Sequence, residues 1–400
     1  MRRLTLVPLC RSARAHLLPL VLALALASCG TDTQTVEPTP ALPVLTVVKG
    51  SGSGSYSPGQ LVHVWADPTK DGATPAATVF ERWQGDVAVL TDPTMTQASF
   101  VMPSASMTLT ATYEAAALWT AERMVARGLV VNSYFPPNHR GVLFHFHGTG
   151  GSSDNLVTKV ESVIFLRYAV AAGYAVVVPE SSDRTNKQWQ VSVDWSTNPD
   201  YVNISDLVAY FKNQGKIGAT EPLVGVGTSN GGGFVPYIAD LLGFKASVSF
   251  IAPGNVHRLM QSTVPWMGVL QQNDDVLAAG WLEDAEATQK DCIDRGVATE
   301  LYVNEPSPLY PERFWRLGTL SPTDSQAIFQ SLKGGGFLDA NDFLIESPKV
   351  SSWAAVIPAA YSAPDLMKDI GDQLECSHAT HIFSSDYDAK VIQFFDRFVP

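Results

Sequence analysis

The spacing of hydrophobic and polar positions changes along the chain. In residues 44–114 apolar side chains tend to alternate with polar ones, most clearly from 107 to 113, where they alternate with threonines. A period of two is typical of a half-buried β-strand. From Gly128 onward, apolar runs of strand length alternate with stretches whose apolar residues recur at helical spacing. This change predicts a small all-β module followed by a larger α/β domain.

The second part contains a regular succession of predicted elements. Predicted strands and helices cover 129–135, 141–147, 157–172, 174–179, 200–212, 223–226, 245–251, 265–271, 278–295, 299–304 and 323–333. Such alternation favours a mostly parallel sheet with helices on both faces. We therefore predict an α/β fold, doubly wound, preceded by the all-β module. Ligands of such a sheet bind at the carboxyl ends of its strands.

Composition agrees with a folded protein of two domains. The chain has 400 residues, of which 46% are hydrophobic and 16% charged. These fractions are typical of globular proteins, and the length is sufficient for two domains.

The N-terminal segment predicts export rather than a folded element. Four arginines precede an apolar run at 17–26, which is short for a membrane span, and Leu26-Ala27-Ser28-Cys29-Gly30 follows. This arrangement resembles a bacterial lipoprotein signal; the alternative is an ordinary secretory peptide with a chance cysteine. The resemblance implies removal of residues 1–28, a lipid on Cys29, and a place in the cell envelope facing the periplasm or exterior. Residues 29–43, rich in Thr and Pro, predict a tether.

Processing would make the protein strongly acidic. Loss of residues 1–28 removes four arginines and leaves 23 basic and 39 acidic side chains, a net charge of −16. This charge argues against nucleic acid and anionic membrane surfaces as partners. Cys292 and Cys376 remain as a possible disulfide in an oxidising compartment. No cysteine spacing typical of a metal site is present, and we expect neither metal nor cofactor.

The all-β module carries its own motifs. They are Phe80-Glu81-Arg82-Trp83-x-Gly85-Asp86, Phe100-Val101-Met102-Pro103 and Leu109-x-Ala111-x-Tyr113. Together they resemble the divergent internalin-type B repeat, of which one copy is visible. The resemblance implies a β-rich spacer or adhesion module. Its aromatic residues either pack in the core or bind a ligand, and core packing is the commoner use.

A glycine-rich stretch links a predicted strand to a predicted helix. It reads Gly227-Thr228-Ser229-Asn230-Gly231, between the apolar run 223–226 and an apolar-periodic run beginning at Phe234. G-x-S-x-G in this context is typical of a nucleophile elbow, because glycines on either side of the serine leave room for a tight turn. The alternative is a glycine-rich turn with an incidental serine. Pro236 predicts a small distortion of the helix.

A serine nucleophile needs a base, an acid and oxyanion donors. Position along the chain leaves His378 and His381, near the C-terminus, as bases. Asp274 and Asp275 follow the strand 265–271 and are the candidate acids; capping a helix is the alternative role for either.

These features together resemble the α/β-hydrolase family over residues 129–400. The strand ending at His147 continues into Gly148-Thr149-Gly150-Gly151, which resembles that family's oxyanion loop. The resemblance implies Ser229, Asp274 and His381 as the triad, in the family's chain order. It also implies the backbone N–H groups of Thr149 and Asn230 as oxyanion donors.

Residues 305–375 depart from the simple pattern of the family. This insertion precedes the histidine loop, and we expect a lid or a substrate platform. We also expect aromatic residues to line the mouth of the site: Phe146, Trp189, Trp195, Phe234 and Trp353.

The features predict a serine hydrolase acting on carboxylic esters, either small or polymeric. The Ser-Asn-Gly-Gly elbow resembles secreted polyester depolymerases and aromatic-ester esterases. The alternatives are a secreted peptidase of the prolyl-oligopeptidase type and a non-catalytic adhesin on a hydrolase scaffold. The sequence does not set the oligomeric state.

Overall fold

A computed structural model describes residues 41–67, 78–116, 119–191 and 194–400. The predicted signal peptide, the lipidation site Cys29 and most of the tether lie outside these residues. In the part of the chain that the structure describes, no helix is both long enough and apolar enough to cross a bilayer.

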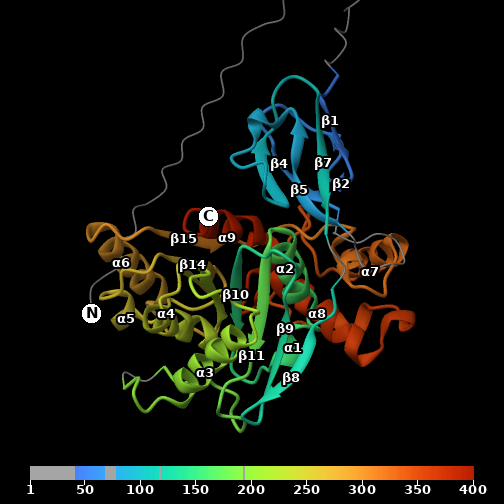
Figure 1. The fold of residues 1–400 in the computed structure, drawn as a ribbon. Helices are drawn as coiled ribbons and strands as arrows, with labels where there is room; N and C mark the ends of the chain where they lie inside the picture. Colours follow the sequence, from blue (N-terminus) through green and yellow to red (C-terminus); the bar gives the residue numbers. More distant parts are fainter. Residues whose placement is uncertain (1–40, 68–77, 117–118, 192–193) are drawn as a thin grey trace, which may run out of the picture. The chain divides into compact units, whose positions relative to one another are not determined.

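The N-terminal module consists of two small sheets (Figure 1). One has the order β3-β1-β7-β5 and the other β2-β4-β6. Their bounds are β1 Val44–Val48, β2 Gly50–Ser51, β3 Gly54–Ser55, β4 Leu61–Ala66, β5 Thr78–Gly85, β6 Gln97–Val101 and β7 Met107–Ala115. The inward residues of the alternating strands, such as Leu45, Val64 and Leu109, pack around the buried Trp83. The alternation in the sequence is therefore the inside–outside pattern of these strands.

The second part is built on an eight-stranded sheet. Its order is β15-β14-β13-β12-β10-β11-β9-β8, and the pairs are parallel except β11–β9 and β9–β8. The bounds are β8 Glu122–Ala126, β9 Leu129–Tyr134, β10 Gly141–Phe146, β11 Tyr174–Pro179, β12 Leu223–Thr228, β13 Ala246–Phe250, β14 Trp266–Gln271 and β15 Thr299–Asn304. The predicted fold class is confirmed: a mostly parallel sheet follows a small all-β module.

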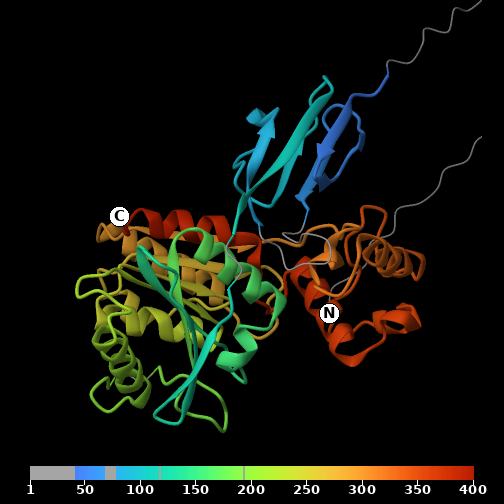
Figure 2. The same ribbon diagram turned by 45° about the vertical axis from the view of Figure 1, so that its right-hand side comes forward.

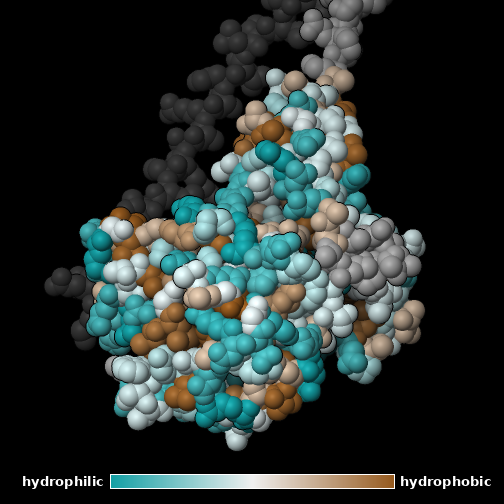
Figure 3. Space-filling model, in the orientation of Figure 1, coloured by the Kyte–Doolittle hydropathy of each residue, from teal (hydrophilic) through white to brown (hydrophobic). Residues whose placement is uncertain are grey.

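Helices cover both faces of this sheet (Figures 1 and 2). On one face α2 (Val160–Ala171) and α9 (Asp388–Asp396) pack against β-strand residues that include Val176 and Val224. On the other face α3 (Pro199–Asn213) and α4 (Asn230–Leu242) pack against neighbouring strand residues. The remaining α-helices of the sheet region are α1 Ser153–Leu156, α5 Val256–Leu259 and α6 Trp281–Asp294. In the view of Figure 3, apolar side chains lie in small groups among hydrophilic ones.

The insertion 305–375 forms a helical layer with its own apolar core. It contains η2 (Arg313–Arg316), α7 (Pro322–Gly334), η3 (Trp353–Val356), η4 (Ala359–Tyr361) and α8 (Pro364–His378). Side chains of these helices, including Phe314, Ile328 and Ile370, form one buried cluster. The predicted helix at 323–333 corresponds to α7, whereas α8 was not predicted. Because α8 ends at His378, it leads the chain directly into the loop that carries His381.

A buried ionic network fastens this insertion to α2. Glu161 of α2 accepts hydrogen bonds from Arg316 Nη1 at 2.9 Å and Gln373 Nε2 at 2.9 Å. It also accepts from the backbone and hydroxyl of Ser385, at 2.9 and 2.7 Å. Burial opposes ionisation of Glu161, but the two arginines Arg316 and Arg313 and the Ser385 bonds outweigh it and lower its pKa. One carboxylate thus joins α2, η2, α8 and the short helix η5 (Ser385–Tyr387) before α9.

Glu161→Gln is expected to destabilise the protein strongly while preserving side-chain shape. Arg313 and Arg316 also contact Asp386, so the substitution leaves two buried guanidinium groups facing one carboxylate. Breaking a buried ion pair typically costs about 3–5 kcal/mol. Urea unfolding measures the change. Asp294→Asn is the control, because it breaks an ion pair with Lys290 in which both side chains are exposed. A loss of stability no greater than that of the control would contradict the role of the network.

The same carboxylate predicts how stability varies with pH. The pKa of Glu161 is lower in the folded protein than in the unfolded chain, so the unfolded chain binds the proton first as pH falls. Its contribution is complete above the unfolded pKa of about 4.3 and is lost as pH falls below it. Wild-type stability should therefore decline more steeply than that of Glu161→Gln below about pH 5.

Candidate active site

Ser229 stands at the sharp turn between β12 and α4. Its backbone has φ 54° and ψ −117°, a conformation that side-chain-bearing residues rarely adopt. The Ser229 N–H donates to the Phe250 carbonyl oxygen at 2.8 Å, which fixes the turn against β13. The serine is therefore held in a strained position at the carboxyl end of the parallel sheet.

The flanking glycines are required by direct steric contact. A Cβ at Gly227 would lie 2.0 Å from the Gly231 carbonyl oxygen. A Cβ at Gly231 would lie 2.4 Å from the Phe146 carbonyl oxygen. No side chain fits at such distances from backbone atoms, so both positions of the G-x-S-x-G pattern are set by the close approach of α4 to β10 and β12.

Pro236 lies inside α4, where a proline removes one backbone hydrogen bond. The acceptor left over is the Gly232 carbonyl oxygen, four residues earlier. Ser249 of β13 donates its hydroxyl to this oxygen at 2.7 Å, and Trp266 Nε1 donates to Ser249 Oγ at 3.0 Å. The predicted distortion is thus compensated by side chains from the sheet beneath the helix.

The structure brings the predicted serine, histidine and aspartate into one hydrogen-bonded chain. His381 Nε2 lies 2.8 Å from Ser229 Oγ. His381 Nδ1 lies 2.7 Å from Asp274 Oδ2. This order suits transfer of the serine proton to an imidazole whose tautomer and orientation are fixed by the carboxylate.

The surroundings of the Asp274 carboxylate favour its ionised form. Its side chain has no exposed surface. Burial opposes ionisation, but the His381 hydrogen bond and the backbone N–H groups of Leu277 and Val276 outweigh it and lower its pKa. Both N–H groups donate to Asp274 Oδ1 at 3.0 Å. The two carboxylate oxygens therefore have separate tasks, one anchoring the turn and one orienting the imidazole.

The two alternative residues lie outside this chain of contacts. Asp275 is half-exposed and binds Lys349 Nζ at 2.6 Å. His378 ends α8, with its Nδ1 3.3 Å from Asn273 Nδ2. Neither contacts Ser229 or His381 among the hydrogen bonds and ion pairs of the described residues.

Two polar residues that were not predicted from the sequence, Gln271 and Asn273, hold the loop that carries His381. Gln271 Nε2 donates to the Ile382 carbonyl oxygen at 3.1 Å. The Asn273 backbone N–H donates to the Ala379 carbonyl oxygen at 2.9 Å. Asn273 Nδ2 donates to the His378 carbonyl oxygen, also at 2.9 Å. Polar side chains at the end of the buried strand β14 are the signal that could have identified them.

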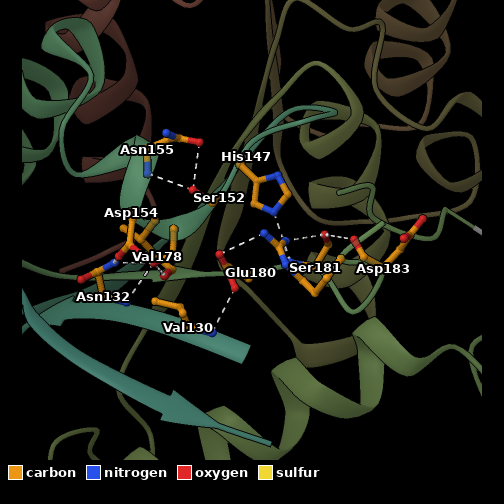
Figure 4. Close-up of polar contacts among 12 residues, drawn as sticks. Val130, Asn132, His147, Ser152, Asp154, Asn155, Val178, Glu180, Ser181 and Asp183 are labelled. Carbon is orange, nitrogen blue, oxygen red and sulfur yellow. Dashed lines mark hydrogen bonds and ion pairs between the residues drawn. The ribbon is translucent and has the colours of Figure 1, made fainter. Parts of the chain in front are cut away.

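The loop after β10 lies beside the serine. At Gly148, a Cβ would lie 3.2 Å from Ser229 Cβ. His147 Nε2 accepts from the Ser181 N–H at 3.2 Å (Figure 4), so Nδ1 carries the proton and donates to the Gly148 carbonyl oxygen at 2.7 Å. Burial lowers the pKa of His147 to about 4, which keeps its ring neutral. Within the described residues, the N–H groups of Thr149 and Asn230 have no hydrogen-bond acceptor.

A cavity of about 670 Å³ opens at Ser229 and His381. One part of its wall is apolar, with Leu156, Val160, Ile251, Val276, Ile382 and Phe383. Another part carries Lys159 at the start of α2 and Lys368, Asp369 and Asp372 of α8. The insertion therefore supplies a wall of the cavity through α8.

The predicted aromatic lining is wrong. Phe146, Trp189 and Phe234 are buried in the core formed with α3 and α4, where Trp189 stacks on Phe234 and Phe146 meets both rings edge-on. Trp195 is exposed and packs edge-on against Tyr201, and Trp353 packs in the core of the insertion. The cavity takes its apolar surface from aliphatic side chains and Phe383 instead.

The predicted disulfide is contradicted as well. Cys292 and Cys376 are both buried free thiols. Cys292 lies on α6 against the Leu259 carbonyl oxygen, whereas Cys376 lies on α8 against that of Phe383. The two helices carry the sulfurs into separate parts of the core. Among the described residues, no group of three or more His, Cys, Asp or Glu is placed to hold a metal ion.

Comparison with known proteins gives a family match for the N-terminal all-β module and several solved structures similar to the α/β domain that follows it. Residues 44–117 match the family described as Divergent InlB B-repeat domain. The search of curated proteins found no match.

Three similar solved structures are named as hydrolases or esterases. An S-formylglutathione hydrolase from Agrobacterium tumefaciens is 16% identical over 46% of this chain and 84% of that chain, with a TM-score of 0.36. A ferulic acid esterase is 13% identical over 51% and 96%, with a TM-score of 0.38. Est1E from Butyrivibrio proteoclasticus is 16% identical over 46% and 87%, with a TM-score of 0.32. The chain thus carries a divergent InlB B-repeat domain, and its strand order and elbow show that the part which follows has the α/β-hydrolase fold.

Proposed function

We propose that this chain is a serine hydrolase that cleaves carboxylic esters through an acyl-enzyme, anchored at the cell envelope by a lipid on Cys29. The observation that supports the chemistry most directly is the unbroken hydrogen-bonded chain from Ser229 through His381 to Asp274. It lies at a cavity whose volume falls within the range of about 300–1,000 Å³ typical of small-molecule sites.

Acylation follows from this geometry. Ser229 Oγ attacks the carbonyl carbon of the ester while its proton passes to His381 Nε2. Asp274 stabilises the imidazolium that forms. The carbonyl oxygen becomes an oxyanion, which the N–H groups of Thr149 and Asn230 receive. When the carbon–oxygen bond of the ester breaks, the alcohol leaves with the proton held by His381.

Deacylation reverses these roles. A water molecule gives a proton to His381 Nε2 and attacks the acyl carbon. The bond to Ser229 Oγ then breaks, Oγ recovers the proton from His381, and the carboxylic acid departs. Each step uses the same base and the same oxyanion donors, so one arrangement serves both halves of the reaction.

The cavity favours an ester with a modest acyl group and a polar remainder. Aliphatic side chains and Phe383 suit a short acyl or aromatic group. Elsewhere the wall carries two lysines, two aspartates and Glu161, whose charge is compensated by Arg316. They favour neutral groups that both donate and accept hydrogen bonds over groups of net charge.

Ester and amide substrates distinguish this proposal from the peptidase alternative. We expect turnover of short-acyl p-nitrophenyl esters and weak or no cleavage of p-nitroanilides with the same acyl groups, because amides demand more help for the leaving group. The measurement is kcat/KM for both series, with Ser229→Ala as the control for contaminating hydrolases. Comparable or higher values on the anilides would favour the peptidase. Binding without turnover of either series would favour the adhesin.

A further inference from the structure

Trp189 contacts both sides of the proposed oxyanion site. It lies between β11 and α3, in a segment whose ends Asp200 holds by accepting from the N–H groups of Ser182 and Gln190, each at 2.6 Å. Asp200 is itself buried. Trp189 therefore stands on a segment that is fastened independently of the nucleophile elbow and of the loop after β10.

Its indole fixes the first side. Trp189 Nε1 donates to the His147 carbonyl oxygen at 2.8 Å. His147 is two residues before Thr149, whose N–H is one proposed oxyanion donor. On the other side of Thr149, the Gly150 N–H donates to the carbonyl oxygen of Lys187, which belongs to the same segment as Trp189, at 3.2 Å. The peptide that carries the Thr149 N–H is thus held on both sides by one segment.

Its backbone fixes the second side. The Trp189 N–H donates to Asn230 Oδ1 at 2.6 Å, and Asn230 Nδ2 donates to the Trp189 carbonyl oxygen at 3.2 Å. The Asn230 side-chain amide is therefore held at two points, one accepting and one donating. Asn230 also carries the second proposed oxyanion donor, its backbone N–H.

We propose that Trp189 is a positioning residue that sets the separation of the two oxyanion donors, an inference that rests on the proposed hydrolase function. An oxyanion site works only when its donors are already placed about 2.7–3.1 Å from the developing charge. The two donors belong to different loops, and Trp189 joins them. Filling the core would require only its ring, which stacks on Phe234 at 4.8 Å. The bond from its Nε1 to the His147 carbonyl oxygen goes beyond that need, and the same residue makes the two backbone contacts with Asn230.

Two variants separate positioning from packing. Trp189→Phe keeps an aromatic ring against Phe234 and removes the indole N–H. Asn230→Ala keeps the backbone N–H donor and removes the side-chain clamp. Trp83→Phe is the matched control, because Trp83 is also fully buried and its Nε1 donates to a backbone carbonyl oxygen, that of Met95, at 3.0 Å. It lies in the B-repeat module, outside the α/β-hydrolase part of the chain.

We expect each of Trp189→Phe and Asn230→Ala to lower kcat roughly 10- to 100-fold, short of the 10²–10³ lost with a whole oxyanion donor. KM for a p-nitrophenyl ester should stay within about twofold, because the loss falls on the transition state. The rate at which a fluorophosphonate labels Ser229 should fall in parallel, because its phosphoryl oxygen occupies the same site. Trp83→Phe should change neither rate.

The outcomes are distinct. Equal labelling rates and equal kcat in wild type and Trp189→Phe, with active protein counted by titration, would overturn the positioning role and leave the proposed function intact. A loss matched by Trp83→Phe, or one confined to KM, would also overturn it. A wild-type protein that is neither labelled at Ser229 nor active on esters would overturn the proposed function, and this inference with it.

Discussion

Ser229→Ala should abolish ester hydrolysis while the protein remains folded. Loss of a triad serine lowers turnover by roughly six orders of magnitude in a well-studied serine protease. The substitution removes only Oγ, which lies 2.8 Å from His381 Nε2. Alanine keeps the Cβ, so the strained backbone at φ 54° is neither relieved nor worsened. The measurement is kcat on a p-nitrophenyl ester alongside thermal unfolding.

The control for this variant is its thermal unfolding midpoint, which shows whether the protein is still folded. An unfolding midpoint close to that of wild type would attribute the loss to chemistry. A folded Ser229→Ala protein that retains a tenth of wild-type activity would remove Ser229 from the nucleophile's role.

His381→Ala should be as severe as Ser229→Ala. His381 is the side chain that contacts both Ser229 Oγ and Asp274 Oδ2, so its loss leaves no base for the serine proton. Because the triad acts as a unit, the double variant should be little worse than either single one. The measurement is kcat for both single variants and the double variant.

His378→Ala is the matched control, three residues earlier on the C-terminal end of α8. The bond from Asn273 to the His378 carbonyl oxygen survives this substitution. Activity should stay within about threefold of wild type, as for residues that do not contact the reacting atoms. If His378→Ala were inactive and His381→Ala active, the catalytic base would be His378 and not His381.

The sequence was most informative where burial and steric limits act locally. The strands β10 to β14 are buried along nearly their whole length because a parallel sheet is covered on both faces. The bounds of β10 to β15 were predicted within about two residues, as expected for strong patterns. The elbow was recognisable because no side chain fits at Gly227 or Gly231. Ser229, Asp274 and His381 were selected by family resemblance, and the structure brings them together, while their catalytic role remains a prediction.

The errors concern long-range placement. β8 was missed because none of the residues of this edge strand is fully buried, and its pattern is hence weak. α8 was missed although its apolar residues are at helical spacing, within a polar stretch that was treated as one insertion. Cys292 and Cys376 were paired by their place along the chain, which does not reveal where their sulfurs point. Trp189 was assigned to the mouth of the site because an aromatic residue alone does not distinguish core from cavity.

The role of Ser229 is tested most directly by treating wild-type protein with an organophosphonate and mapping the adduct by mass spectrometry. We expect one phosphonyl group per protein, on Ser229, with labelling abolished in Ser229→Ala and strongly slowed in His381→Ala. An adduct on another residue, or no adduct under conditions that label a known serine esterase, would contradict this role.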